Sequence, residues 1–91
     1  MPRKTYRVDA NHAQIVKVLR SAGVSVVSLA SVGGGCPDIL CGYGGKNYLF
    51  EIKDTGKLQE NQKEFKRKWN GETKVIYNAI QALTLMGIRV Q

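Results

Sequence analysis

The 91-residue chain carries two carboxylates and a lysine, Asp38, Glu51 and Lys53, on either side of an apolar segment. The pair Gly44-Gly45 interrupts that segment and is typical of a two-residue β-hairpin turn, because both central residues of such a turn need positive φ. Side chains alternate between the two faces of a strand, so Glu51 and Lys53 share one face. The hairpin therefore predicts a polar site at the open ends of two strands.

The register of this hairpin would bring the two carboxylates face to face. If Tyr43 pairs with Lys46 across the turn, Asp38 lies directly opposite Glu51. Like charges at opposed positions, with Cβ atoms about 5 Å apart, destabilise a strand pair. A divalent cation removes that repulsion, and hard Mg²⁺ or Mn²⁺ binds carboxylate oxygens together with water and substrate phosphate. We therefore expect a metal at Asp38, Glu51 and the backbone carbonyl of Ile52, against the simpler interpretation of a polar strand end.

Composition indicates one small basic domain over residues 1–91. Apolar residues make up 43% of the chain, enough for a globular core rather than a disordered segment. The 14 Lys and Arg against 7 Asp and Glu give a net charge of +7. Such an excess predicts a polyanionic partner, with nucleic acid as the first expectation and an anionic membrane surface as the second.

The cysteines and the absence of long apolar runs favour an intracellular protein of the cytoplasm. Cys36 and Cys41 would point to opposite faces about 16 Å apart along an extended strand, too far for a disulfide. Two Cys and one His are also too few for a zinc site. No apolar run approaches the ~20 residues that span a bilayer, and the N-terminus lacks the apolar segment of a secretory signal.

Hydrophobic patterning predicts an α/β fold with the order α-β-β-β-α-β-α. The helices are expected at residues 9–22, 59–69 and 79–86, with Asp9 and Asn78 as N-caps. The strands are expected at residues 24–31, on both sides of the glycine turn, and at residues 74–77. A strand–helix–strand passage implies a parallel pair, so the central sheet should be mixed. Apolar residues on both faces of the hairpin predict helices on both faces of the sheet.

Three polar residues fall on or beside the helix faces that should turn inward. Asn11 lies on the apolar stripe of the first predicted helix and His12 on its margin, where each is either solvent-facing or aimed at a site. Gln62 lies between Leu58 and Phe65 on the buried line of the second predicted helix. A buried amide costs free energy unless it is hydrogen-bonded. Gln62 therefore bonds either to the sheet backbone or to the carboxylate site.

Basic side chains cluster on and just before the second predicted helix. Those expected to contact DNA are Lys57, Lys63, Lys66 and Arg67. A solvated helix surface is the ordinary explanation for such a cluster, although the same charges would suit a phosphate backbone.

The pattern of these residues resembles that of the PD-(D/E)xK nuclease superfamily. The features that carry the resemblance are GGGCPD at residues 33–38, the Gly-Gly turn, EIK at residues 51–53, and the helix with Gln62, Phe65 and Trp69. Within the superfamily it looks like a small stand-alone VRR-NUC domain of the kind phages encode. Residues 15–53 are also similar to archaeal Holliday junction resolvases.

The resemblance implies a restriction-endonuclease-like fold and metal-dependent hydrolysis of DNA phosphodiesters. Asp38 and Glu51 would hold Mg²⁺ or Mn²⁺, and Lys53 would orient the attacking water or offset charge on the transition state. Gln62 matches a glutamine of the family's second helix and would join the catalytic residues.

One departure from the family pattern lies in the first helix. Such enzymes often place an acid there, and the candidates here are Asn11, His12 and Gln14. The loss of that charge bears on how many metals bind and how tightly.

The expected function is that of a divalent-metal-dependent endonuclease. We expect it to be selective for four-way or branched DNA, to act as a homodimer in a phage or bacterial host cell, and to need no membrane. One competing hypothesis is a non-catalytic nucleic-acid-binding module with the same fold. Another is a structural subunit whose carboxylates bind only a stabilising ion.

Overall fold

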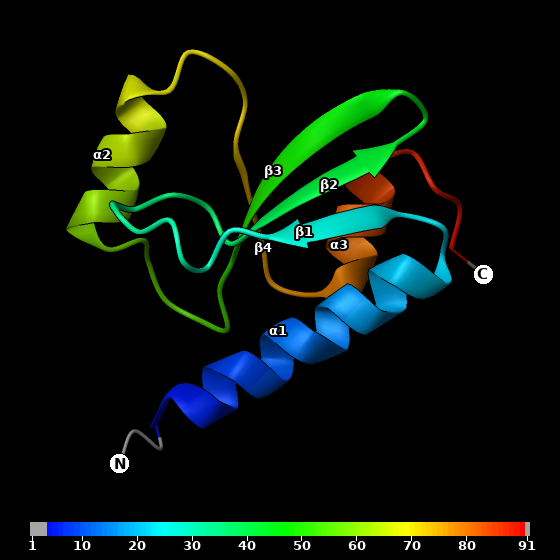
Figure 1. Ribbon diagram of the computed structural model, residues 1–91, viewed down its shortest axis with the longest axis horizontal. Helices are drawn as coiled ribbons and strands as arrows, with labels where there is room; N and C mark the ends of the chain where they lie inside the picture. Colours follow the sequence, from blue (N-terminus) through cyan, green and yellow to red (C-terminus); the bar gives the residue numbers. More distant parts are fainter. Residues whose placement is uncertain (1–3, 91) are drawn as a thin grey trace.

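A computed structural model describes the backbone of residues 4–90 and the side chains of residues 11–90 (Figure 1). The elements are α1 (Lys4–Ser21), β1 (Ser25–Ser28), β2 (Ile39–Tyr43), β3 (Lys46–Ile52), α2 (Glu60–Lys68), β4 (Lys74–Ile76) and α3 (Ala79–Leu85). This order confirms the predicted α/β class and the predicted sequence of helices and strands. The architecture agrees with a restriction-endonuclease-like fold.

The four strands form one mixed sheet in the order β1-β2-β3-β4. The first two pairings are antiparallel, and β3 pairs with β4 in parallel. Gly44 and Gly45 both have positive φ (61° and 80°), as the predicted two-residue turn requires. The parallel pair follows from the crossover through α2, so its prediction is confirmed.

One face of the sheet carries the core. Ile39, Phe50, Ile52 and Ile76 lie on this face and are 0–4% exposed. Helix α1 packs against α3 and β1, and α3 packs against β4 (Figure 1). The Arg20 guanidinium also donates a hydrogen bond of 2.9 Å to the Val26 carbonyl, which ties the end of α1 to the edge strand.

The opposite face is covered only at one end, which corrects the expectation of helices over both faces. Helix α2 stands to one side of the sheet in Figure 1, and none of its nine residues is buried. A groove of about 560 Å³ remains, with Leu40 and Leu49 of the hairpin on one side and Phe65 and Trp69 on the other. Helix α2 does not close this groove.

Two element boundaries differ from the predictions. Helix α1 begins at Lys4, so Asp9 lies inside the helix and the N-cap prediction was wrong; residues 5–8 contain no helix breaker that would stop it earlier. Strand β1 ends at Ser28 rather than at residue 31, because its pairing with β2 ends there and the chain turns into the glycine-rich loop.

The other helix ends follow the sequence closely. Gln59 and Trp69 are the caps of α2, within a residue of the predicted ends. Asn78 caps α3 by accepting a 2.9 Å hydrogen bond from the Gln81 amide. Residues 88–90 form no strand, and Gln91 lies outside the described residues.

Candidate active site

The hairpin brings the two carboxylates together at one end of the sheet, although Asp38 lies outside the regular register that was predicted to pair it with Glu51. Tyr43 pairs with Lys46, and the ladder runs to Ile39 opposite Phe50. Beyond this pair the Asp38 amide donates a 3.0 Å hydrogen bond to the carbonyl of the same Phe50, so the regular ladder ends here. Asp38 therefore lies just beyond the last regular pair, where its carboxylate is close enough to Glu51 to raise the pKa of that carboxyl.

Asp38 is fixed by the backbone of the neighbouring strand. Its Oδ2 accepts a 2.7 Å hydrogen bond from the Ile52 amide. In a strand, the N–H and C=O of one residue point to the same edge. The Ile52 carbonyl is therefore directed to the edge of β3 where Asp38 lies. Together with Glu51, these residues supply two carboxylates and one backbone carbonyl as hard oxygen donors.

Glu51 is 6% exposed and is the only charged side chain among residues 11–90 that is buried. Burial, followed by the hydrogen bond and the negative charge of Asp38, raises the pKa of Glu51 to about 8, while the charge of Lys53 acts in the opposite direction. A carboxyl that holds its proton so strongly is one that a divalent cation can stabilise as a carboxylate.

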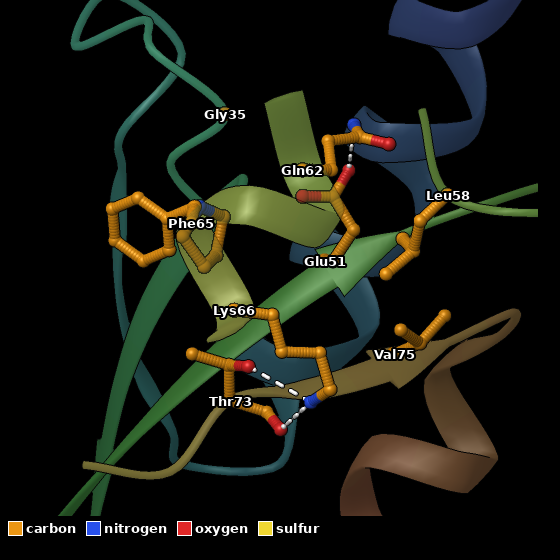
Figure 2. Close-up of a pocket in the computed structure, with 9 residues that line it drawn as sticks. Gly35, Glu51, Leu58, Gln62, Phe65, Lys66, Thr73 and Val75 are labelled. Carbon is orange, nitrogen blue, oxygen red and sulfur yellow. Dashed lines mark hydrogen bonds between the residues drawn. The ribbon is translucent and has the colours of Figure 1, made fainter. Parts of the chain in front are cut away.

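Gln62 resolves the alternative left by the sequence, because it reaches the site and not the sheet backbone. Its Nε2 donates a 2.8 Å hydrogen bond to Glu51 Oε2, from the position shown in Figure 2. Its Oε1 accepts from the Gln59 amide at 2.8 Å and lies 3.5 Å from Lys53 Nζ. The side chain thus joins the start of α2 to both functional groups of β3.

The loop before β2 is held against α2 at Gly35. This residue has a φ of 82°, and a Cβ there would collide with the backbone carbonyl of Asn61. Glycine is therefore required both by the left-handed backbone and by the close approach. The contact brings Pro37 and Asp38 to the same end of the sheet as Gln62.

The first-helix candidates have separate surroundings. Asn11 Nδ2 donates a 2.7 Å hydrogen bond to Asp54 Oδ1, and Gln14 is exposed. His12 Nε2 lies 3.9 Å from Asp38 Oδ2. Of the three, His12 is the one that the structure brings beside the carboxylates.

A cavity of about 200 Å³ opens between α1 and the end of β3. Its lining includes Asn11, His12, Lys53, Asp54 and Thr55. Asp54 and Thr55 were not among the predicted site residues. Asp54 could have been considered because it directly follows Lys53 in the sequence. However, side chains alternate between the faces of a strand, so this rule would have predicted that Asp54 points away from the site.

Cys36 carries a thiol close enough to be affected by the carboxylates, and its environment suppresses the reactivity of that thiol. Burial, and then the negative charges of Glu51 and Asp38, raise the pKa of the Cys36 thiol. Since the thiolate is the nucleophile, these surroundings disfavour covalent catalysis by this residue.

The predicted DNA-contacting residues lie on or near α2, mostly in local pairs. Lys63 is 3.5 Å from Glu60, and Arg67 is 2.6 Å from Glu64. Lys66 donates to the Thr73 carbonyl at 2.7 Å and to its hydroxyl at 3.0 Å, as Figure 2 shows. Lys57 is exposed in the loop before α2. The role of these residues in binding DNA stays a prediction.

The donor set fits a hard divalent cation with few protein ligands. Among the described residues no group of three or more His, Cys, Asp and Glu side chains could hold a metal by itself. Mg²⁺ usually takes one or two carboxylates and completes its shell with water and phosphate. The carboxylates of Asp38 and Glu51, with the Ile52 carbonyl, match that pattern.

Comparison with protein families matches residues 4–83 to the archaeal Holliday junction resolvase family (Hjc). The chain belongs to this family. The match covers every helix and strand except the end of α3. It agrees with the second of the two resemblances, a PD-(D/E)xK-type resolvase, whereas the VRR-NUC grouping stays a prediction. Hjc proteins are Holliday junction resolvases, which are structure-selective nucleases, so the family indicates endonuclease activity.

Comparisons with curated proteins and with solved structures gave no match. Within the described residues, no helix is both long and apolar enough to cross a bilayer.

Proposed function

We propose that this protein is a divalent-metal-dependent endonuclease that hydrolyses phosphodiester bonds in four-way or branched DNA, acting as a homodimer inside the cell. The observation that carries the proposal is the placement of Asp38, Glu51 and Lys53 at one end of the hairpin in a chain of the Holliday junction resolvase family. The finer grouping with phage-type VRR-NUC domains rests on the motifs at residues 33–38 and 51–53.

Asp38, Glu51 and the Ile52 carbonyl would hold Mg²⁺ or Mn²⁺. When bound, such an ion lowers the pKa of a water ligand and polarises the phosphate. Gln62 holds the Glu51 carboxylate in place through its 2.8 Å hydrogen bond, so this oxygen does not have to be ordered during the reaction. The Ile52 amide does the same for Asp38 at 2.7 Å.

Lys53 supplies positive charge on the face that carries the carboxylates. Its Nζ lies 3.5 Å from Gln62 Oε1, a long contact that leaves the ammonium available to a phosphate. A fixed charge beside the scissile group stabilises the negative charge that develops in the transition state. Because the neighbouring Cys36 thiol has a raised pKa, we propose direct attack by water.

The homodimer is supported by the symmetry of the substrate and by the open face of the sheet. Resolution of a four-way junction needs two cuts, and a two-fold dimer presents two equivalent sites. The groove beside Leu40, Leu49 and Trp69 leaves apolar surface exposed on a small domain, and a second copy packed there would bury it. Sedimentation of a monomer at micromolar concentration, with and without junction DNA, would contradict this part of the proposal.

A cleavage panel tests the activity. Single strand, duplex, flap, fork and four-way junction DNA are each incubated with Mg²⁺, with Mn²⁺ and with EDTA. We expect symmetric nicks in the four-way junction with either metal and none with EDTA.

Two other outcomes would favour the competing functions. Binding of junction DNA without cleavage under either metal would support a non-catalytic binding module. Absence of DNA affinity at low salt would support a structural role for the carboxylates.

A further inference from the structure

Helix α2 ends in an aromatic stack that belongs neither to the core nor to the carboxylate pair. The rings of Phe65 and Trp69, one helical turn apart, have centroids 5.3 Å apart and planes inclined by 17°. Trp69 is 45% exposed. Both rings line the largely apolar groove of about 560 Å³ beside the hairpin, so the exposed indole is part of a continuous surface and not an isolated surface residue.

The indole ring is held in position by the chain around it. Phe65 stacks against it, and a Cβ at Gly71 would come within 2.8 Å of Trp69 Nε1. Gly71 does not have a positive φ, so glycine is needed here for space and not for the backbone conformation. A ligand that stacks on this ring therefore meets a surface that is already ordered.

The groove adjoins the carboxylate site. Cys36 lines the groove, and the charges of Glu51 and Asp38 contribute to the raised pKa of its thiol. Phe65 lines the groove and also, with Glu51 and Gln62, the pocket drawn in Figure 2. A DNA strand with one phosphate at the carboxylates would therefore place a neighbouring nucleotide at the groove.

The charge beside the groove suits nucleic acid. Helix α2 carries four basic side chains, Lys63, Lys66, Arg67 and Lys68, against two acidic ones, and the whole chain has a net charge of +7. Proteins hold unpaired nucleotides by combining basic side chains, which contact the phosphates, with aromatic rings, on which the bases stack.

We propose that the Phe65–Trp69 stack takes an unstacked nucleobase of the DNA substrate next to the scissile phosphate, and that this contact makes cleavage selective for branched DNA. The inference rests on the proposed function, since it assumes a DNA phosphate at the carboxylates. Extruding a base costs least where the base is already unpaired, so a branch point supplies it more readily than an intact duplex. The homodimer would then use the hairpin side of the groove, at Leu40 and Leu49, and leave the aromatic side to DNA.

Tryptophan fluorescence tests the contact without any substitution. The chain contains a single tryptophan, so the indole signal of untagged protein reports on Trp69 alone. In EDTA, saturating four-way junction or single-stranded DNA should quench this signal, and intact duplex should quench it clearly less. Bound junction DNA with unchanged fluorescence would overturn the inference. A blue shift that depends on protein concentration and not on DNA would also overturn it, because a second copy would then cover the ring.

Affinities for the four-way junction and for intact duplex test the selectivity. Trp69→Ala should lower the ratio of junction to duplex affinity by about 5- to 150-fold, the range measured when an aromatic ring that stacks on a base is removed. Trp69→Phe keeps a stacking ring and should stay within about threefold of the wild type. Gly71→Ala, which displaces the indole without removing it, should lower the same ratio.

Tyr43→Ala is the matched control. Tyr43 is also an exposed aromatic residue (38%), but it lies beside the turn, at the other end of the hairpin from Asp38. The control should keep the wild-type ratio, and circular dichroism checks the folding of every variant. An unchanged ratio in folded Trp69→Ala would overturn the inference, and if that variant does not fold, the fluorescence titration of the wild type decides.

The same measurements separate this inference from the proposed function. If wild type cuts the four-way junction and Trp69→Ala keeps the wild-type affinity ratio, the proposed function stands and the inference alone fails. If wild type neither binds nor cuts any DNA, both fail.

Discussion

The two faces of the sheet are built from alternate residues of the same strands, yet they differ in burial and in chemistry. Phe50 and Ile52 of β3 point to the face under α1 and α3 and are 0% and 4% exposed. Glu51, between them, points to the opposite face and meets Asp38, Gln62 and the charge of Lys53. The strand is thus held by its core residues while its alternate residues do the chemistry.

The difference extends to how each face is covered. Two helices close the core face, whereas α2 reaches only one end of the other and leaves Leu40 and Leu49 beside an open groove. Incomplete cover gives DNA or a second copy access to the second face. Because the second face is incompletely covered, the stability of the domain depends mainly on the core face.

Removal of a site residue should abolish cleavage and leave the fold intact. Asp38→Ala, Glu51→Ala and Lys53→Ala should each reduce the rate of junction cleavage by several orders of magnitude, because each removes a ligand or a charge used in the transition state. Cleavage is measured on the four-way junction, with circular dichroism as the check on folding. A variant whose cleavage rate is within about tenfold of that of the wild type has lost only about 1.4 kcal/mol of transition-state stabilisation. Such a result would show that the role assigned to that residue is wrong.

Truncation of two neighbouring residues in β3 should show that the two faces of the sheet contribute differently to the stability of the fold. Phe50→Ala should lower the free energy of unfolding by about 3–5 kcal/mol, since Phe50 is 0% exposed and the truncation leaves a cavity in the core. Leu49→Ala, one residue away on the partly covered face, should lower the free energy of unfolding clearly less than Phe50→Ala does. Urea denaturation in EDTA measures both. Equal losses would show that the second face contributes as much to the fold as the first.

The pH dependence of stability should come from Glu51 on the site face. Its pKa is raised from 4.5 to about 8 in the folded protein, so the folded state binds more protons than the unfolded state within this window. Stability of the metal-free protein is therefore fully present below the unfolded pKa and is lost as pH rises through the folded value. The slope is at most about 1.4 kcal/mol per pH unit.

Unfolding of wild type and Glu51→Gln in EDTA from pH 5 to pH 9 measures this contribution. The variant should lack the decline, because it has no proton to lose in that range. Saturating Mn²⁺ should flatten the wild-type curve, since the cation takes the place of the proton. Parallel curves for the two proteins without metal would contradict the assignment.

The local features of the site could be predicted from the sequence, because they depend on short-range rules. Gly44-Gly45 predicted the turn and the pairing from Tyr43–Lys46 to Ile39–Phe50, and with it the end of the sheet at which Asp38 and Glu51 lie. Gln62 was recognised as a polar residue on an apolar line, and its hydrogen bond to Glu51 explains that exception.

The remaining features depend on how distant segments pack. The choice of His12 over Asn11 follows from the rotation and position of α1 against the end of β3, which helical periodicity gives only within a broad arc. The open second face could not be foreseen, because a count of apolar residues does not say how far α2 stands from the sheet. The sequence likewise shows the charge of Lys66 but not its contacts with Thr73.

The smallest expected effect tests the pairing of carboxylates independently of activity. Asp38→Asn should stabilise the metal-free fold by about 0.2–1 kcal/mol, because it removes one of two like charges and keeps an acceptor for the Ile52 amide. Since protonation of Glu51 relieves the same repulsion, the gain should be larger at pH 9 than at pH 6. Mn²⁺ should stabilise wild type by RT ln(1 + [L]/Kd), and the variant should lose most of that gain because an amide is a poor ligand for a hard cation. The two melting temperatures should therefore exchange order as the metal is titrated. If the variant instead melts lower without metal and keeps the full response to Mn²⁺, the two carboxylates do not form the metal site.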